Sequence, residues 1–290
     1  MIFAISDPIL QYFTFFSSIE MLLYAIIVGY FMLLFFFFLF IRYRTSKKLY
    51  WLFFSVFFLC FGIGRTFFIL YYFYAPELYD PIAMNGTEVV SSLMLYFRFA
   101  TFFTWMGVTC LVGLLGILLL PPEAKAEQGE EKVKSSENWF KDKNNIKIVI
   151  RIILIVIPFV IGILALILPD NVFMDPDFET DYNISVNLIT VKIGSWEYPI
   201  GRFLYNFIMM PILVAIIPFI FLYLAWKTFG VLRKSYALNA FGFFLYWIGR
   251  ILQGALDVAS LPHLKAVLPP LIILIALLII VIANNYEQLK

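Results

Sequence analysis

Long runs without a single charged side chain are the feature that most constrains how this sequence can fold. A helix needs about 20 mostly apolar residues to cross a bilayer, and uncharged runs of at least that length occupy Met21–Ile41, Phe99–Pro122, Phe203–Trp226 and Ala266–Tyr286. Hydrophobic residues make up 63% of the chain and charged residues 14%, against about 45–50% and about 25% in soluble domains. The sequence therefore predicts an integral, multi-pass membrane protein.

The hydropathy pattern predicts an all-α fold with seven transmembrane helices in a single transmembrane domain that covers residues 1–290. We find no stretch between the helices that is long enough to form a second domain. A short surface hairpin is expected in the outer link Asn183–Ile193, where β-branched residues partly alternate. The predicted helices are 19–41, 49–74, 93–120, 147–168, 199–226, 236–260 and 266–285.

Orientation follows from the positions of lysine and arginine, which favour cytoplasmic links. The link after the first helix, Arg42–Lys48, is basic, and so is the link after the fifth helix, while the link after the third holds six lysines among acidic residues. The alternate links Pro76–Pro81 and Pro169–Asp181 are acidic. The sequence therefore predicts that the N-terminus lies outside and the C-terminus inside, with the cell membrane as the expected location.

Two aromatic helices carry similar phrases, FGIGRTFF at Phe61–Phe68 and YWIGRILQ at Tyr246–Gln253. Both helices run from the inside to the outside in the predicted topology. The phrases therefore suggest a parallel repeat of three helices, one linker helix and three helices, a device known from transporters. Chance similarity between two aromatic membrane helices is the alternative.

This architecture resembles the broad group of seven-helix membrane proteins that includes sugar-transporter-type, opsin-type and receptor-type proteins. The resemblance lies in the number and orientation of the helices and in the three-one-three arrangement. In opsins a lysine in the last helix holds retinal. Because Ala266–Tyr286 contains no lysine, the sequence does not indicate a retinal pigment, and no cofactor is expected.

Charged residues within the predicted helices gather near the outer end. At 1.5 Å of rise per residue, Arg65 and Arg250 lie about 25 Å from the cytoplasmic edge. Polar side chains that share a helix face with such arginines should point into the bundle or into water. They predict an outward-facing vestibule whose candidate ligand-binding residues are Arg65, Arg250, Asp257, Gln253, Arg98, Arg202, Asn206, Tyr205 and Glu20.

Two interpretations of these arginines stay open. In the functional one they bind an anion, because guanidinium groups match carboxylates and phosphates bidentately. In the structural one Arg250 pairs with Asp257, Arg65 pairs with Glu20 or with tyrosine hydroxyls, and Arg98 and Arg202 extend outward to the membrane surface. The functional interpretation predicts a small anionic or amphipathic ligand that enters from outside.

Other chemistry has little support in the sequence. The acidic stretch Asp175–Asp181 lacks the glycine and glutamate of a calcium loop, and His263 is the single histidine, so we expect no metal site. No nucleophile is paired with a base, so no enzymatic activity is expected, and nothing indicates nucleic acid as a partner. The favoured function is a sensor or receptor that signals to a cytoplasmic or intramembrane protein partner; the alternatives are a small-solute transporter and a non-catalytic subunit of a membrane complex.

Overall fold

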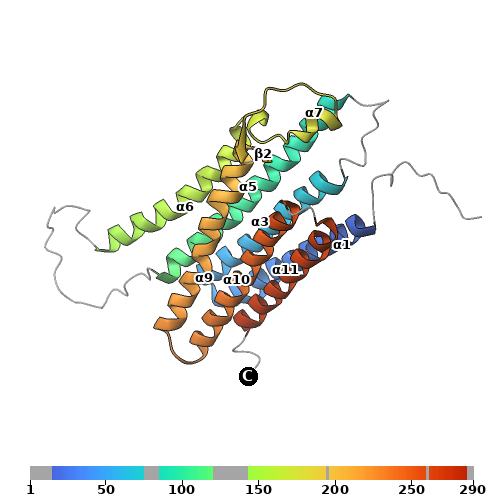
Figure 1. Ribbon diagram of the computed structural model, residues 1–290. Helices are drawn as coiled ribbons and strands as arrows, with labels where there is room; N and C mark the ends of the chain where they lie inside the picture. Colours follow the sequence, from blue (N-terminus) through green and yellow to red (C-terminus); the bar gives the residue numbers. More distant parts are fainter. Residues whose placement is uncertain (1–14, 75–84, 120–142, 194–195, 259–260, 286–290) are drawn as a thin grey trace, which may run out of the picture.

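The computed structural model describes residues 15–74, 85–119, 143–193, 196–258 and 261–285. Within these ranges the chain is helical almost throughout, with one short β-hairpin (Figure 1). In an apolar environment a helix satisfies its backbone hydrogen bonds internally, which explains why the uncharged runs form helices. The all-α fold expected from the sequence is confirmed.

The main helices are longer than the sequence predicted at several of their ends. In particular, α5 begins seven residues and α10 six residues earlier than expected, because polar residues extend each helix beyond its apolar run. The main helices are α1 (Phe15–Phe36), α3 (Leu49–Ile69), α5 (Gly86–Leu119), α6 (Lys143–Ile167), α9 (Met210–Lys227), α10 (Gly230–Val258) and α11 (Pro262–Asn285).

Shorter elements continue or connect these helices. The segments η2, η3 and η6 are π-helical continuations, and η5 is a 3₁₀ turn. These elements are η2 (Phe37–Tyr43), α2 (Arg44–Ser46), η3 (Leu70–Tyr74), η5 (Asp170–Val172), α7 (Asp177–Asp181), β1 (Thr190–Ile193), β2 (Trp196–Pro199), α8 (Ile200–Arg202) and η6 (Phe203–Met209).

Within the described residues, six helical segments are long and apolar enough to cross a membrane. They contain α1, α3, α5, α6, α9 and α11. The seventh expected span, α10, is 29 residues long and packs between α9 and α11, but it is more polar than the others. The structure therefore supports a multi-pass membrane protein with six apolar spans by length and composition.

Six of the helices form a ring. Around it α1 packs against α3, α3 against α5, α9 against α10, α10 against α11, and α11 against α1, while a smaller contact between α5 and α9 completes the circuit. The remaining long helix, α6, packs against α5 at the edge of the bundle (Figure 1). The ring brings α3 and α10 to face each other, and the rings of Phe61 and Tyr246 lie 5.9 Å apart.

The contacts of α3 with its neighbours recur in the contacts of α10. Phe38 stacks on Phe58 of α3 with the ring planes 9° apart, and Phe221 stacks on Phe243 of α10 with the planes 8° apart. Phe58 and Phe243 stand at matching positions when the two Gly-Arg phrases are aligned. The same kind of aromatic stack therefore joins α3 to η2, which continues α1, and joins α10 to α9.

The two phrase glycines also make matching close contacts. A Cβ atom at Gly64 would lie 3.1 Å from the carbonyl oxygen of Ala100 on α5, and a Cβ atom at Gly249 would lie 3.3 Å from that of Pro269 on α11. The absence of a side chain lets each helix approach the backbone of its neighbour closely. The glycine before each arginine therefore fixes how α3 and α10 pack.

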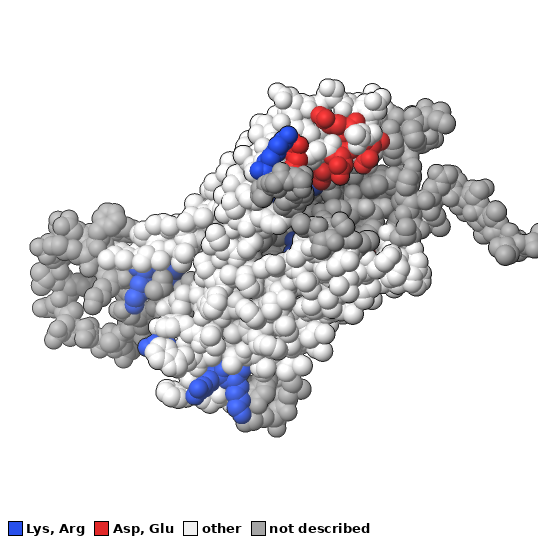
Figure 2. Space-filling view, viewed as in Figure 1, with Lys and Arg blue, Asp and Glu red and all other residues white. Residues whose placement is uncertain are grey.

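One end of the bundle is capped by the segment between α6 and α9. It contains η5, α7 and the hairpin, whose strands pair in the register Val191 with Tyr198. A hairpin was expected in Asn183–Ile193; the prediction captured only its first strand, because the second begins at Trp196. Acidic side chains gather over this cap, and basic side chains gather at the opposite end (Figure 2).

Candidate functional site

A cavity of about 580 Å³ lies inside the ring, between α1, α3, η6, α9 and α10. Five of the predicted ligand-binding residues line it: Glu20, Arg65, Asn206, Arg250 and Gln253. The floor, toward the basic end, is made by Phe31, Phe61 and Val214. The cavity is therefore polar toward the capped end and apolar toward its floor.

Arg65 is the most unusual side chain in the cavity wall. It is only 8% exposed, and its guanidinium carbon lies 4.6 Å from the ring centre of Tyr24 and 5.9 Å from that of Phe68. In the described part of the chain it forms no hydrogen bond and no ion pair. The two aromatic faces stabilise the charge by cation–π interaction, but the described residues offer its N–H groups no acceptor.

The second cavity arginine, Arg250, has one described hydrogen-bond partner. Its Nη1 donates to Oε1 of Gln253, one helical turn along α10, at 3.1 Å. Arg65 and Arg250 are close enough to repel each other electrostatically. Two positive charges brought together in this way favour an anion between them.

Two further polar side chains lie in the wall of the cavity. Tyr24 and Trp247 line it, and the hydroxyl of Tyr24 and the indole N–H of Trp247 are buried with no hydrogen-bond partner among the described residues. Buried polar groups in native proteins nearly always have a partner. These two groups are almost inaccessible themselves, so the positive charge of Arg65 and Arg250 is the feature of the wall that suits an anionic ligand.

The capped end of the cavity is bounded by Tyr198 of β2 and by Lys265 of α11. Burial raises the pKa of Tyr198 to about 12, so its hydroxyl stays protonated over the physiological range and can donate. Glu20 is the acidic side chain of this wall within the described chain, and both Glu20 and Lys265 take part in polar contacts of their own.

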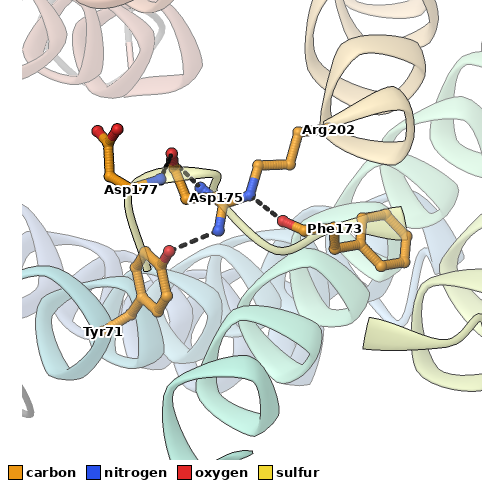
Figure 3. Close-up of polar contacts among 5 residues, drawn as sticks. All are labelled: Tyr71, Phe173, Asp175, Asp177 and Arg202. Atoms are coloured by element: carbon orange, nitrogen blue, oxygen red, sulfur yellow. Dashed lines mark hydrogen bonds and ion pairs between the residues drawn. The ribbon is translucent and has the colours of Figure 1, made fainter. Parts of the chain in front are cut away.

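Arg202 occupies a separate site outside the cavity, beneath the cap (Figure 3). It is 4% exposed. Its Nε donates to the carbonyl oxygen of Phe173, Nη1 contacts Asp175 Oδ2 at 3.2 Å, and Nη2 donates to the hydroxyl of Tyr71 at 2.5 Å. Its guanidinium carbon also lies 4.4 Å from the ring centre of Phe97. Every face of this guanidinium is occupied by protein.

Arg98 also lies outside the cavity and is held by protein acceptors. Its Nη1 donates to the carbonyl oxygen of Leu166 at 2.7 Å, and its Nη2 lies 2.7 Å from Asp170 Oδ1. The expectation that Arg98 and Arg202 extend outward to the membrane surface is therefore wrong. The segment between α6 and α9 supplies the two aspartates and the carbonyl oxygen of Phe173, and the last turn of α6 supplies that of Leu166, so both arginines find partners within the protein.

Three residues of the fifth span that α-helical spacing would place on one stripe, Arg202, Tyr205 and Asn206, point in three directions. Asn206 lines the cavity, whereas the hydroxyl of Tyr205 donates to the carbonyl oxygen of Ile161 on α6 at 3.0 Å. Arg202 points to the cap. The stripe was drawn with α-helical spacing, but Phe203–Met209 is π-helical, and its wider turns rotate neighbouring side chains away from α-helical positions.

Two further points separate the prediction from the observed site. The side chain of Asp257 lies outside the described residues, so its predicted pairing with Arg250 stays a prediction. Tyr24, Trp247, Tyr198 and Lys265 line the cavity but were not predicted. For Tyr24 a signal existed, because it follows Glu20 by one helical turn and shares its face.

Comparisons with known proteins found no matching family model, no matching curated protein and no matching solved structure.

Proposed function

We propose that this protein is a seven-helix, receptor-like membrane protein that binds a small anionic ligand in the cavity beside Arg65 and Arg250. The observation that carries the proposal is Arg65, a nearly buried guanidinium in a cavity wall with aromatic faces but no acceptor among the described residues. An ionisable residue within a membrane protein marks a functional site by default. A bound anion would supply the missing acceptors of both arginines.

The proposal takes α10 as the seventh span. Its length, about 43 Å at 1.5 Å per residue, exceeds the hydrocarbon core, and its neighbours α9 and α11 are apolar spans. Packing between them shields Arg250 from lipid. With seven spans and the positive-inside distribution, the acidic cap lies outside the cell membrane and the cavity faces outward.

The proposal also includes a parallel repeat that relates α1, α3 and α5 to α9, α10 and α11. The matching stacks of Phe38 on Phe58 and of Phe221 on Phe243 support it, as do the matching glycine contacts. The contact between Phe61 and Tyr246 also supports it, because residues related by a two-fold axis meet when they lie next to that axis. The anion would then bind close to the axis, between two equivalent arginines.

A receptor-like role is favoured over transport by the floor of the cavity. A transported anion needs polar groups along the whole path, whereas the inward wall consists of Phe31, Phe61 and Val214. The inner end is closed by contacts of Arg42 with Asn284 and Asn285, including one to Asn285 Oδ1 at 2.7 Å. We propose binding without catalysis, and signalling to a protein partner through the inner links.

The experiment is a titration of the purified protein in lipid nanodiscs with acetate and with inorganic phosphate, followed by calorimetry. Arg65→Met and Arg250→Met should each weaken anion binding at least tenfold, since a charge-assisted hydrogen bond contributes about 1.5–3 kcal/mol. Arg44→Met is the matched control, because Arg44 is exposed at the opposite end. Asp257→Asn should tighten binding if that carboxylate competes with the ligand.

Equal affinity in the wild type, Arg65→Met and Arg44→Met would overturn the proposal. Uptake of labelled acetate into proteoliposomes separates the two functions. The receptor-like proposal expects no uptake above that of empty vesicles, and uptake that Arg65→Met abolishes would favour a transporter instead.

A further inference from the structure

We infer that the cavity binds an amphipathic monoanion, such as a medium-chain carboxylate, with its charged group beside Arg65 and its apolar chain on the aromatic floor. This inference rests on the proposed function and adds the orientation and the chemical class of the ligand. It follows from the change from polar to aromatic side chains along the cavity wall. On both α3 and α10 this change occurs one helical turn from the arginine.

The polar-to-apolar change can be followed along each wall helix. On α3 the wall passes from Arg65 to Phe61, and on α10 from Arg250 to Tyr246, one turn further from the capped end. On α1 it passes from Tyr24 to Phe31 over seven residues, or about 10 Å. The apolar part of the cavity is therefore about 6–10 Å deep below the arginines.

Side chains from α1, α3, α9 and α10 meet at the bottom of the cavity. The rings of Phe61 and Tyr246 meet at 5.9 Å, and Phe31 packs edge-on against Phe61, so the floor is a continuous aromatic surface. Val214 closes it from α9. A small inorganic anion would leave this surface without a partner, whereas an attached chain would cover it and gain the free energy of apolar burial.

The charged group of the ligand follows from the chemistry of the wall. Arg65, Arg250 and Lys265 against Glu20 leave the described wall with a net positive charge, which favours an anion. A planar carboxylate matches a guanidinium fork with two parallel hydrogen bonds and carries one charge. An extended chain advances about 1.3 Å per carbon, slightly less than one C–C bond, so roughly eight carbons fill the depth.

The test is a chain-length series of acetate, butyrate, hexanoate, octanoate and decanoate, titrated into the protein in nanodiscs. Each added pair of methylenes should raise the affinity about tenfold until the cavity is full, and the increase should then stop. Octanol and octylamine should bind at least tenfold more weakly than octanoate. Arg65→Met, or Arg250→Met where the first variant is poorly folded, should remove the difference between octanoate and octanol.

A second variant locates the chain. Val214→Phe should fill the floor, so the affinity should stop rising at a shorter chain while acetate binding is unchanged. Val156→Phe, on the exposed face of α6, is the matched control and should leave the series unaltered. Extending the series to palmitate identifies the source of the ligand: a plateau near eight carbons indicates a ligand from water, and continued tightening to palmitate indicates one drawn from the bilayer.

The possible failures are distinguishable. Arginine-dependent binding with the same affinity for acetate and octanoate would overturn this inference and leave the anion site in place. Equal binding of octanol and octanoate, without dependence on Arg65, would overturn both the inference and the proposed function.

Discussion

Two pairs of arginines, placed at similar heights by the sequence, have opposite surroundings in the structure. Arg202 and Arg98 lie under the acidic cap, where carbonyl oxygens and aspartates accept from their guanidinium groups. Arg65 and Arg250 line a cavity, where the described hydrogen bond is a single contact from Arg250 to Gln253. The first pair contributes to the stability of the fold. The second pair has guanidinium N–H groups that find no acceptor among the described residues.

The difference shows that burial of a charge alone does not identify a binding site. Arg202 is more buried than Arg65, yet each of its three guanidinium nitrogens contacts an acceptor, two of them in the cap and one on Tyr71 of η3 (Figure 3). What distinguishes Arg65 is that its neighbours are aromatic faces and open space. On the proposed function, the arginine that binds the ligand is Arg65, for which the described residues supply aromatic faces and no hydrogen-bond acceptor.

The largest expected effect comes from removing Arg202. Arg202→Met leaves the carbonyl oxygen of Phe173 and the partly exposed carboxylate of Asp175 without their donor, and after solvent screening of the carboxylate this loss costs about 3 kcal/mol. The free energy of unfolding, measured by denaturant titration in micelles, should fall by that amount. A loss below about 1 kcal/mol would mean that the cap does not depend on this network.

Removing Arg65 should not lower the free energy of unfolding. Arg65→Met relieves a nearly buried charge without an acceptor, and the lost contacts with the rings of Tyr24 and Phe68 cost only about 1 kcal/mol. We expect the free energy of unfolding to stay constant or to rise by about 1 kcal/mol, while anion binding is lost. Destabilisation as large as that of Arg202→Met would erase the difference between the two pairs.

The ion pair of Arg98 and Asp170 should contribute an amount of stability between those of Arg202 and Arg65. Its carboxylate is 43% exposed, so solvent screens the interaction, and such pairs contribute about 0.2–1 kcal/mol. A double-mutant cycle with Arg98→Met and Asp170→Asn should return a coupling free energy in that range. A coupling near zero would indicate that Arg98 is held mainly by the carbonyl oxygen of Leu166.

The smallest effect concerns the pH dependence of the cap. Partial desolvation, together with the charges of Asp175 and Asp181, raises the pKa of Asp177 above its ordinary value of 3.8. An acid with a raised pKa favours folding below its unfolded pKa and loses that contribution as the pH rises through its folded pKa.

Asp177→Asn should therefore stabilise the protein at neutral pH, by about 0.3 kcal/mol after solvent screening. The gain should disappear when the pH falls below about 4. Unfolding curves at pH 7 and pH 3.5 would check this, and a gain that persists at the lower pH would exclude titration of Asp177 as its cause.

The sequence predicts the helices well and the directions of their side chains less well. Uncharged runs determine where helices form, because lipid leaves the backbone no other partner. The repeated Gly-Arg phrases predicted that Arg65 and Arg250 lie at the same depth. In the structure both arginines line one cavity, from helices that face each other. The contacts of Arg202 could not be predicted, because they depend on the π-helical segment η6 and on the long connection between α6 and α9. Neither has a simple periodic signal in the sequence.

The most direct test of the central claim is a structure with octanoate that carries bromine on its last carbon. The account predicts an anomalous bromine peak beside Phe31 and Phe61, carboxylate density beside Arg65, and neither feature in Arg65→Met. Carboxylate density at Arg98 or Arg202, or bromine only on the lipid-facing surface, would contradict it.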